Sequence, residues 1–377
     1  MRIGIVCYPT FGGSGVVATE LGMALADNGH EVHFITYNQP VRLDFLSHKL
    51  HFHQVLIEEY PLFQYQPYEL ALSSKMVEVV KKYHLEVLHV HYAIPHAYAA
   101  FMAKQMLLEK GINVKVVTTL HGTDITLVGS HPTYKTAVEF SINHSDVVTA
   151  VSNNLKETTN ELFHVNKEIR VIYNFIDIKK YEKAEDDDCN RIALAKPEER
   201  ILTHISNFRK VKRIEDVIKV FYEVQKEIPS KLLLVGEGPE RVKAENLTKK
   251  LKIKESVYFL GNSTEVTKIL CYSDLFLLPS ETESFGLAAL EAMAAKTPVI
   301  STNTGGLPEV NIHGKTGFLS NLEDVEDMAK NAISILKDDQ TLARFKSNAY
   351  EHAKKFSIQN ILPVYEEIYK SCYKSRV

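Results

Sequence analysis

Short apolar runs alternate with longer amphipathic stretches along the first half of the chain, and this alternation constrains the fold more than any other feature. The runs expected to form strands are RIGIVCY, EVHFIT, HFHQVLI, EVLHVHY, KVVTTLH and DVVTAVS. A helix is expected over 15–28, because Gly29 follows it as a stop signal. Runs of Val, Ile, Leu and Thr between helices are typical of a parallel sheet that is covered on both faces.

The alternation begins again in the second half of the chain and indicates a second α/β domain. Its expected elements are the strands RILTHIS, KLLLVGEG, SVYFLG, LFLLPS, TPVIST and GFLS, and a helix over 211–227. The segment 179–200 is polar and charged, so we place the hinge just upstream, near 174–177. The predicted domains are 1–173 and 174–357. The helical tail at about 358–377 suits packing on either domain, including a return to the first.

The composition excludes several classes of protein. The 377 residues carry a formal net charge of -3, which gives no general attraction to nucleic acid or to an anionic membrane. No apolar run approaches the roughly 18 residues of a membrane span, and the N-terminus lacks the pattern of a signal peptide. The cysteines are far apart and suggest neither a zinc site nor a disulfide framework; they are Cys7, Cys189, Cys271 and Cys372. We expect a cytoplasmic protein without nucleic-acid or membrane partners, and the sequence leaves a homo-oligomer open.

A glycine-rich loop follows the first expected strand. Gly13, Gly15 and Ala18 fit G-x-G-x-x-A, the spacing of a dinucleotide-binding turn at a helix start. A P-loop is excluded because no Gly-Lys-Ser/Thr follows. A dinucleotide site would also need an acidic residue at the end of the second strand, where 36–39 reads TYNQ and Arg42 is the nearest basic residue. An NADP site and a ligand-free tight turn therefore both stay open.

The strongest motif is LLPSETESFGLAALEAMAAKTPVISTNTGGLPEV, at 277–310. A helix is expected to start near Gly286, where free backbone N–H groups suit sugar hydroxyls or phosphate oxygens. Glu283 then lies in the loop before the helix, and Glu291 lies about two turns inside it. The two carboxylates could thus meet two parts of one ligand. By spacing alone they could equally be two solvated glutamates.

These motifs together resemble a known family. The pair Glu283 and Glu291, the GGLPE turn, the LLLVGEGPE segment and the GGSG loop are similar to those of the GT-B family of retaining glycosyltransferases, which are related to glycogen and sucrose synthases. The resemblance extends from Gly12 to about Val364. It implies two Rossmann-like domains whose parallel sheets face each other across a cleft that holds the active site. The C-terminal domain would bind a nucleotide-sugar donor, and the N-terminal domain an acceptor.

Longer strings narrow the resemblance within this family. They are CYPTFGGSGVVATELG, HVHYAIPHAYAA, TTLHGTDITLVG, VIYNFID and HISNFRKVKRIEDVI. They are similar to those of the transferases that begin bacillithiol biosynthesis by joining GlcNAc from UDP-GlcNAc to the hydroxyl of L-malate. The resemblance therefore implies these two substrates. Three alternatives stay open: the same fold with an inositol phosphate or lipid acceptor, an NADP-dependent oxidoreductase, and a catalytically idle nucleotide-sugar-binding module.

The resemblance also assigns roles on the donor side. Lys212 and Arg209 match a basic pair that faces the donor diphosphate, although many relatives carry the arginine two positions earlier, where this chain has Asn207. Cations at an expected helix start oppose the helix dipole, which favours a compensating anion, and they would stabilise departing UDP. Glu291 is expected to bind the ribose diol and Glu283 the 3-hydroxyl of GlcNAc. The donor-binding set is Gly13, Gly15, Arg209, Lys212, Glu283, Phe285, Gly286, Leu287 and Glu291.

The catalytic set is His121, Lys212, Arg209 and Glu283, in which His121 matches the histidine that hydrogen-bonds the 6-hydroxyl of the donor sugar. The acceptor is a dicarboxylate, which calls for hydroxyls and N–H groups. The candidate acceptor-binding residues are Ser14, Tyr92, Thr119 and Asn153. No carboxylate occupies the position of a nucleophile, so we expect front-face attack in which the β-phosphate oxygen accepts the proton of malate.

We expect no metal ion and no other cofactor. His89, His91 and His96 lie close in sequence, as do His51 and His53, but neither set has a carboxylate nearby in the sequence. No Asp-x-Asp pair at a sheet edge is available to bind magnesium and UDP, and the retaining GT-B enzymes generally need none.

Overall fold

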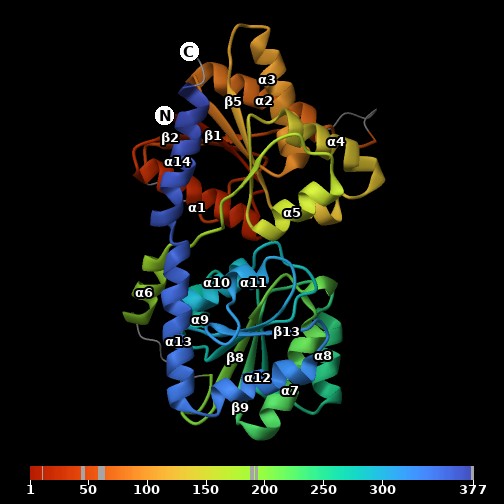
Figure 1. The fold of residues 1–377 in the computed structure, drawn as a ribbon, viewed down its shortest axis with the longest axis vertical. Helices are drawn as coiled ribbons and strands as arrows, with labels where there is room; N and C mark the ends of the chain where they lie inside the picture. Colours follow the sequence, from red (N-terminus) through yellow and green to blue (C-terminus); the bar gives the residue numbers. More distant parts are fainter. Residues whose placement is uncertain (11, 44–46, 58–63, 187–190, 192–193, 375–377) are drawn as a thin grey trace. The chain divides into compact units, whose positions relative to one another are not determined.

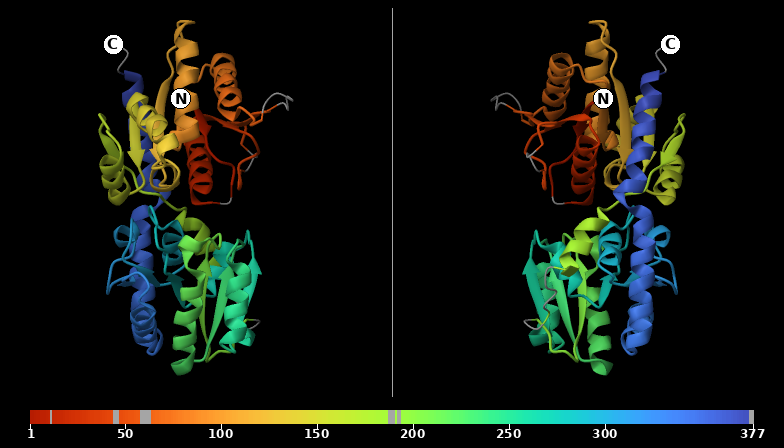
Figure 2. Two further views of the ribbon diagram at one scale, coloured as in Figure 1. Left: turned by 90° about the vertical axis from the view of Figure 1, so that its right-hand side faces the viewer. Right: turned by 90° about the vertical axis from the view of Figure 1, so that its left-hand side faces the viewer.

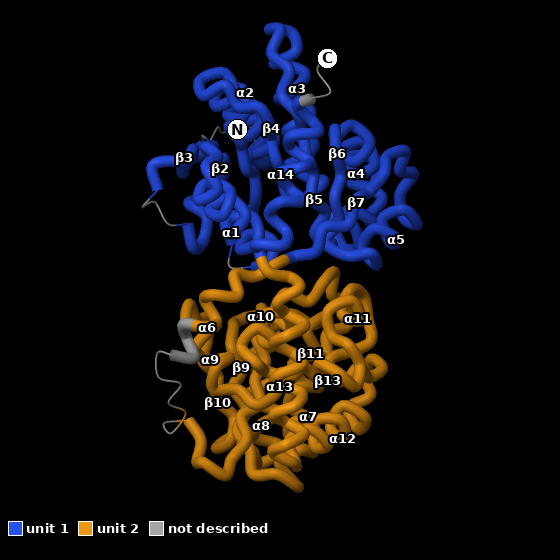
Figure 3. Tube along the Cα trace, turned by 60° about the vertical axis from the view of Figure 1, so that its left-hand side comes forward, with its two compact units in different colours: residues 1–174, 358–377 blue, residues 175–357 orange. Residues whose placement is uncertain are grey.

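The structure is a computed structural model that describes residues 1–377 apart from residues 11, 44–46, 58–63, 187–190, 192–193 and 375–377. The chain divides into two compact units (Figures 1 and 3). Unit 1 comprises residues 1–174 and 358–377, and unit 2 comprises residues 175–357. Each unit contains a parallel sheet flanked by helices, so the predicted α/β class with two Rossmann-like domains is confirmed.

Unit 1 is built, within its described residues, on a seven-stranded sheet in the order β3-β2-β1-β4-β5-β6-β7, and all neighbouring strands are parallel. The strands are β1 (Arg2–Val6), β2 (Glu31–Thr36), β3 (Leu50–Gln54), β4 (Val87–His91), β5 (Lys115–Leu120), β6 (Val147–Ala150) and β7 (Ile169–Val171). The first six match the expected runs. The seventh has only three residues, too few to show a period in the sequence.

Helices connect these strands and flank the sheet. They are α1 (Gly13–Asp27), α2 (Tyr68–Tyr83), α3 (Tyr98–Leu108), α4 (Pro132–His144), α5 (Asn153–Leu162) and α14 (Ile358–Lys374), with the short turns η1 (Ala93–Ala97) and η2 (Thr123–Leu127). The C-terminal α14 contacts α1 and β5 and so belongs to unit 1, as the side views of Figure 2 also show. An apolar core between α2, α3 and the sheet buries residues such as Met76, Leu88 and Ala103.

Unit 2 repeats this design with a sheet whose described strands follow the order β10-β9-β8-β11-β12-β13. The strands are β8 (Arg200–Ile205), β9 (Ser230–Val235), β10 (Val257–Gly261), β11 (Leu275–Leu278), β12 (Val299–Thr302) and β13 (Gly317–Ser320). The helices are α6 (Ile178–Asp186), α7 (Ile214–Glu227), α8 (Arg241–Lys250), α9 (Val266–Cys271), α10 (Leu287–Ala294), α11 (Leu307–Val310), α12 (Val325–Leu336) and α13 (Asp339–Ala353). Among its described residues, unit 2 also contains the 3-10 turns η4 (Lys210–Lys212), η5 (Lys254–Ser256) and η6 (Lys354–Phe356).

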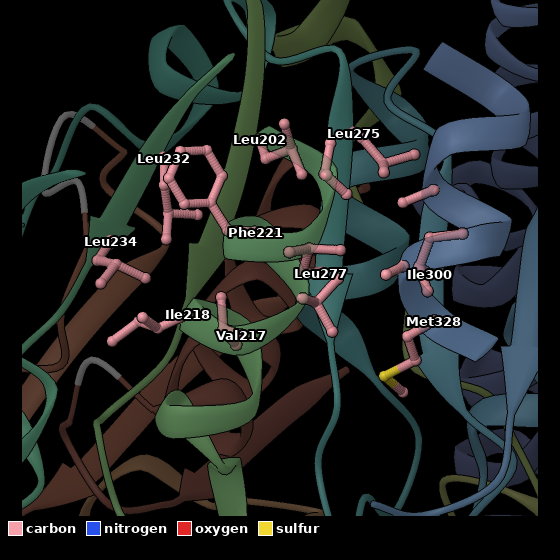
Figure 4. Close-up of a cluster of buried hydrophobic side chains, with 14 of the residues drawn as sticks. Leu202, Val217, Ile218, Phe221, Leu232, Leu234, Leu275, Leu277, Ile300 and Met328 are labelled. Atoms are coloured by element: carbon pink, nitrogen blue, oxygen red, sulfur yellow. The ribbon is translucent and has the colours of Figure 1, made fainter. Parts of the chain in front are cut away.

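The core of unit 2 lies between its central strands and α7. Val217, Ile218 and Phe221 project from α7 toward Leu232 of β9 and Leu277 of β11 (Figure 4). All five side chains are fully or almost fully buried. Because parallel strands covered on both faces must be apolar throughout, this core explains why the second-half strands read as continuous runs of Leu, Val and Ile.

The helix expected over 211–227 begins later than predicted, at Ile214. Arg213 has a φ of 52°, in the left-handed region, and Lys210–Lys212 form a 3-10 turn before it. The basic residues therefore precede the helix, and its first turn is acidic, which complements the helix dipole. The expectation that cations in a helix start demand a bound anion is wrong for this reason.

The spacing of the cysteines suggested no disulfide framework, but the structure contains a disulfide-bonded cysteine. Cys271 is disulfide-bonded, whereas Cys7 and Cys372 are free and buried, and Cys189 lies outside the described residues. None of the described helices is long and apolar enough to cross a membrane.

Candidate active site

In unit 2, three loops leave the carboxyl ends of β8, β11 and β12, which are neighbours in the sheet. Ligands of open parallel sheets bind at this edge. The loop after β8 carries Lys212, and the loop after β11 carries Glu283. Nζ of Lys212 donates to Oε1 of Glu283 at 2.5 Å, and the Ser280 hydroxyl donates to the same oxygen at 2.9 Å. The structure thus brings together two of the predicted catalytic residues.

The GGLPE turn after β12 holds the loop of Glu283 in place. A Cβ at Gly305 would lie 2.0 Å from the carbonyl oxygen of Glu283, and a Cβ at Gly306 would lie 2.4 Å from that of Ser284. The N–H of Gly306 donates to the Glu283 carbonyl at 2.8 Å. Only glycines permit this close approach, so the turn positions the carboxylate through backbone contact.

The start of α10 agrees with the predicted donor-binding helix. Gly286 has a φ of 96° and precedes Leu287, and no side chain caps the helix. The Phe285 side chain is buried against Phe356, with ring centroids 5.7 Å apart, so only its backbone can serve a ligand. Glu291 lies half-buried in the second turn of α10, as expected. A helix start without a side-chain cap leaves its N–H groups for an anion or hydroxyl.

The two predicted cations differ in their surroundings. The Lys212 side chain is 20% exposed and ion-paired, whereas Arg209 is exposed and has no ion pair among the interactions of the described residues. His204 lies on β8, the strand that precedes both cations. It is buried and hydrogen-bonds the Ser206 hydroxyl and the Leu277 carbonyl oxygen, both at 2.8 Å. Burial lowers the pKa of His204 to about 4, so the ring is neutral and supports the site without adding charge.

In unit 1, the carboxyl ends of β1, β4 and β5 present a second group of polar side chains. Ser14, after β1, and Tyr92, after β4, share a hydrogen bond of 2.7 Å between their hydroxyl oxygens. The Tyr92 ring lies 5.2 Å from the ring of His121, which follows β5. Burial raises the pKa of Tyr92 to about 12, so its hydroxyl remains a donor at neutral pH. Three predicted site residues therefore meet at one edge of the sheet.

His121 belongs to a buried network that the sequence did not reveal. Its Nε2 shares a hydrogen bond of 2.8 Å with Nδ1 of His91. Asp124 accepts the backbone N–H groups of Ala93, His121 and Gly122, at 2.8, 3.2 and 3.0 Å. Burial lowers the pKa of His121 to about 3 and raises that of Asp124 to about 6. The neutral imidazole is held in place by His91 and by the Asp124 turn.

The other two predicted acceptor residues lie near the carboxyl ends of β5 and β6, and their side chains bond to other groups within unit 1. The Thr119 hydroxyl is fully buried and hydrogen-bonds His89 Nε2 at 2.7 Å and the Thr149 hydroxyl at 2.8 Å. The hydroxyl therefore has its partners within unit 1, and the Thr119 carbonyl oxygen accepts the N–H of the predicted acceptor tyrosine at 2.9 Å. Asn153 begins α5 after β6, and its Nδ2 donates to the Tyr173 hydroxyl at 2.8 Å.

The two predicted glycines of the opening loop have different roles. Gly15 is buried, and a Cβ there would lie 2.5 Å from the Tyr8 carbonyl oxygen, so the turn itself requires glycine. Gly13 is exposed and is the first residue of α1, which Gly12 precedes without any side-chain cap. The first turn of α1 has no acidic residue and can therefore face an anion.

One group of possible metal ligands could not be seen from sequence spacing. A carboxylate does lie beside one of the histidine sets: Glu31, His33 and His51 place one ligand atom each within 4.8 Å of the others. No other such group of three occurs in the part of the chain that the structure describes, so His89, His91 and His96 have no acidic partner of this kind there.

Comparisons with known proteins agree with this geometry. The family "Glycosyltransferase Family 4" matches residues 11–180, and "Glycosyl transferases group 1" matches residues 186–352. The fold is similar to sucrose-phosphate synthase from Thermosynechococcus elongatus (TM-score 0.79, 23% identity, all of both chains covered). It is also similar to Anabaena HepE in complex with UDP and glucose (TM-score 0.80, 19% identity, 98% of this chain and 100% of that chain covered).

The chain belongs to these GT-B glycosyltransferases. Within the family it is 49% identical over 370 residues to the N-acetyl-alpha-D-glucosaminyl L-malate synthase of Bacillus anthracis, covering 98% of this chain and 96% of the relative.

Proposed function

We propose that this glycosyltransferase moves GlcNAc from UDP-GlcNAc to the hydroxyl of L-malate with retention of configuration, the first step of bacillithiol biosynthesis. The observation that carries the proposal is the 49% identity, across nearly the whole chain, to a relative named for this product. The contact between Lys212 and Glu283 supports it, because it pairs a cation suited to phosphate with a carboxylate suited to a sugar hydroxyl.

On the donor side, unit 2 supplies the binding groups. Glu291 accepts two hydrogen bonds from the ribose diol, and Glu283 accepts one from the 3-hydroxyl of GlcNAc. The backbone N–H groups at the start of α10, around Gly286, bind donor oxygens. Lys212 leaves Glu283 in part and faces the diphosphate, with the exposed Arg209 beside the same group.

The chemical step exchanges one bond at the anomeric carbon for another on the same face of the sugar. The bond from C1 to the β-phosphate oxygen breaks as the malate hydroxyl oxygen bonds to C1, and a β-phosphate oxygen takes the hydroxyl proton. Negative charge grows on UDP, and Lys212 and Arg209 stabilise it, so the reaction needs no metal ion. His121 hydrogen-bonds the 6-hydroxyl and holds the sugar in the reactive orientation.

On the acceptor side, unit 1 supplies hydroxyls and N–H groups for malate. The Ser14 and Tyr92 hydroxyls already share a hydrogen bond, so they can turn together toward a carboxylate. The start of α1 at Gly13 favours negative charge nearby. A dicarboxylate fits this set better than a neutral acceptor would.

The test measures UDP release from UDP-GlcNAc in the presence of separate acceptors: L-malate, myo-inositol 1-phosphate and lipid vesicles. UDP release that depends on L-malate and saturates with it supports the proposal. Release with another acceptor alone would refute malate as the substrate, and no release with any acceptor would favour a nucleotide-sugar-binding module. Reduction of NADP without UDP release would indicate an oxidoreductase.

A further inference from the structure

A histidine and carboxylate cluster lies at the amino-terminal end of the sheet of unit 1, where the proposed reaction uses no residue. Glu31 and His33 are two positions apart on β2 and therefore share one face of the sheet. His51 lies on the edge strand β3, directly opposite His33 in the parallel register. Ser14 and Tyr92 follow the carboxyl ends of their strands, so the cluster and these two residues lie at opposite ends of the strands of one sheet.

Two of the three separations between ligand atoms are close to those around a tetrahedral ion. Nε2 of His33 lies 3.2 Å from Oε1 of Glu31, and Nε2 of His51 lies 3.5 Å from the same oxygen. Two ligands about 2.0–2.1 Å from a zinc ion, at tetrahedral angles, are about 3.3 Å apart. All three atoms lie within 4.8 Å of one another. Small side-chain rotations would therefore complete three bonds to one ion.

The surroundings orient the buried ligand and leave access for a fourth one. Nδ1 of His33 hydrogen-bonds Nε2 of His53 at 2.9 Å, which directs its Nε2 toward Glu31. Histidine ligands regularly use their second ring nitrogen in an outer hydrogen bond, and here the partner is another imidazole. The His33 side chain is 0% exposed, whereas His51 is 34% and Glu31 40% exposed, so water can reach the open position. The Tyr83 ring, at the end of α2, lies 4.6 Å from the His33 ring.

We propose that Glu31, His33 and His51 form a binding site for a divalent transition metal of the zinc class, with water as the fourth ligand. Imidazole and carboxylate ligands suit Zn²⁺ better than Mg²⁺ or Ca²⁺, which prefer oxygen atoms alone. The ion joins the edge strand β3 to β2 and stabilises that edge of unit 1. It takes no part in glycosyl transfer, because the cluster lies at the opposite end of the strands from the proposed acceptor residues.

The test uses the full-length protein without an affinity tag, treated with EDTA and then freed of chelator. Zn²⁺ binding is measured by calorimetry, and Co²⁺ binding by the visible absorption of a tetrahedral site. The variants are Glu31→Gln and His51→Gln, both at partly exposed side chains. The matched control is His48→Gln, since His48 is an exposed histidine near His51 outside the cluster.

The wild type and the control are expected to bind one Zn²⁺ per chain, with a tetrahedral Co²⁺ spectrum and a raised melting temperature in Zn²⁺. Each cluster variant is expected to bind at least tenfold more weakly while keeping the wild-type circular dichroism spectrum. Equal affinity in the variants and the wild type, or no saturable binding by the wild type, would overturn the proposal. Malate-dependent UDP release should persist in EDTA, so this result is separate from the proposed function.

Discussion

Lys212 and Glu283 form an ion pair in unit 2, with 2.5 Å between Nζ and Oε1, although they are 71 positions apart in the chain. Both side chains are only partly exposed, at 20% and 15%. The lysine thus has a carboxylate partner before any phosphate arrives, and the donor must replace part of that contact. In the proposed reaction this exchange couples recognition of the sugar to placement of the cation that stabilises UDP.

Replacing the cation tests this role. Lys212→Met is expected to lower kcat by about 10²–10³, since it removes charge stabilisation that matters most when UDP departs. The Michaelis constant for UDP-GlcNAc should change much less, because the loss falls mainly on the transition state. Steady-state UDP release measures both constants. Lys210→Met, at an exposed neighbour, is the control, and an equal loss in the two variants would contradict the assignment.

Glu291, the glutamate singled out together with Glu283 in the motif at 277–310, should contribute to binding of the donor. Glu291→Ala is expected to weaken UDP affinity by about 10–100-fold, because hydrogen bonds to a charged group contribute about 1.5–3 kcal/mol. Isothermal titration calorimetry with UDP measures this directly. Glu255→Ala, at an exposed site before β10, should leave the affinity unchanged. Wild-type affinity in Glu291→Ala would show that the ribose is bound elsewhere.

The role of His121 is tested through the hydroxyl that it should contact. His121→Ala is expected to lower kcat/KM about 10–100-fold with UDP-GlcNAc, because it leaves the 6-hydroxyl without a partner in a buried site, at a cost of roughly 1–3 kcal/mol. With the 6-deoxy form of the donor, the same substitution should change kcat/KM little, because the hydroxyl that His121 would contact is already missing. A loss of equal size with both donors would mean that His121 acts on folding or on another group.

The buried histidines predict instability in acid. Burial holds several imidazole pKa values near 3 or 4, below the ordinary 6.5; these include His33, His53, His89, His96, His121 and His204. Between pH 6.5 and 4 the unfolded chain binds more protons than the folded chain, so the free energy of unfolding falls as pH falls.

Thermal unfolding followed by circular dichroism at several pH values checks this expectation. The wild-type melting temperature should decrease steadily from pH 6.5 to pH 4.5. His96→Asn removes one buried imidazole, so the slope of the free energy of unfolding against pH should fall by up to about 1.4 kcal/mol per pH unit, the contribution of one proton. His164→Asn, at an exposed site, should leave the steepness unchanged. A melting temperature that is constant over this range would contradict the argument.

Local sequence patterns predicted the strands well, because runs of branched apolar residues in a buried parallel sheet have few other solutions. The pairing of Lys212 with Glu283 was not predictable by spacing, since it depends on which strands become neighbours. The same holds for Glu31, which meets His51 only through the register of β2 and β3. Asp124 stood in the quoted HGTD string, three residues after His121, yet its contacts required the turn to be seen.

Identification of the product tests the central claim most directly. The protein, UDP-GlcNAc and L-malate are incubated together, and proton NMR follows the anomeric signal of the new glycoside. We predict UDP and an α-linked N-acetylglucosaminyl malate in equal amounts, with the small anomeric coupling constant of an α-glycoside. A β-linked product would contradict retention, and UDP with free GlcNAc but no malate adduct would contradict the proposed acceptor.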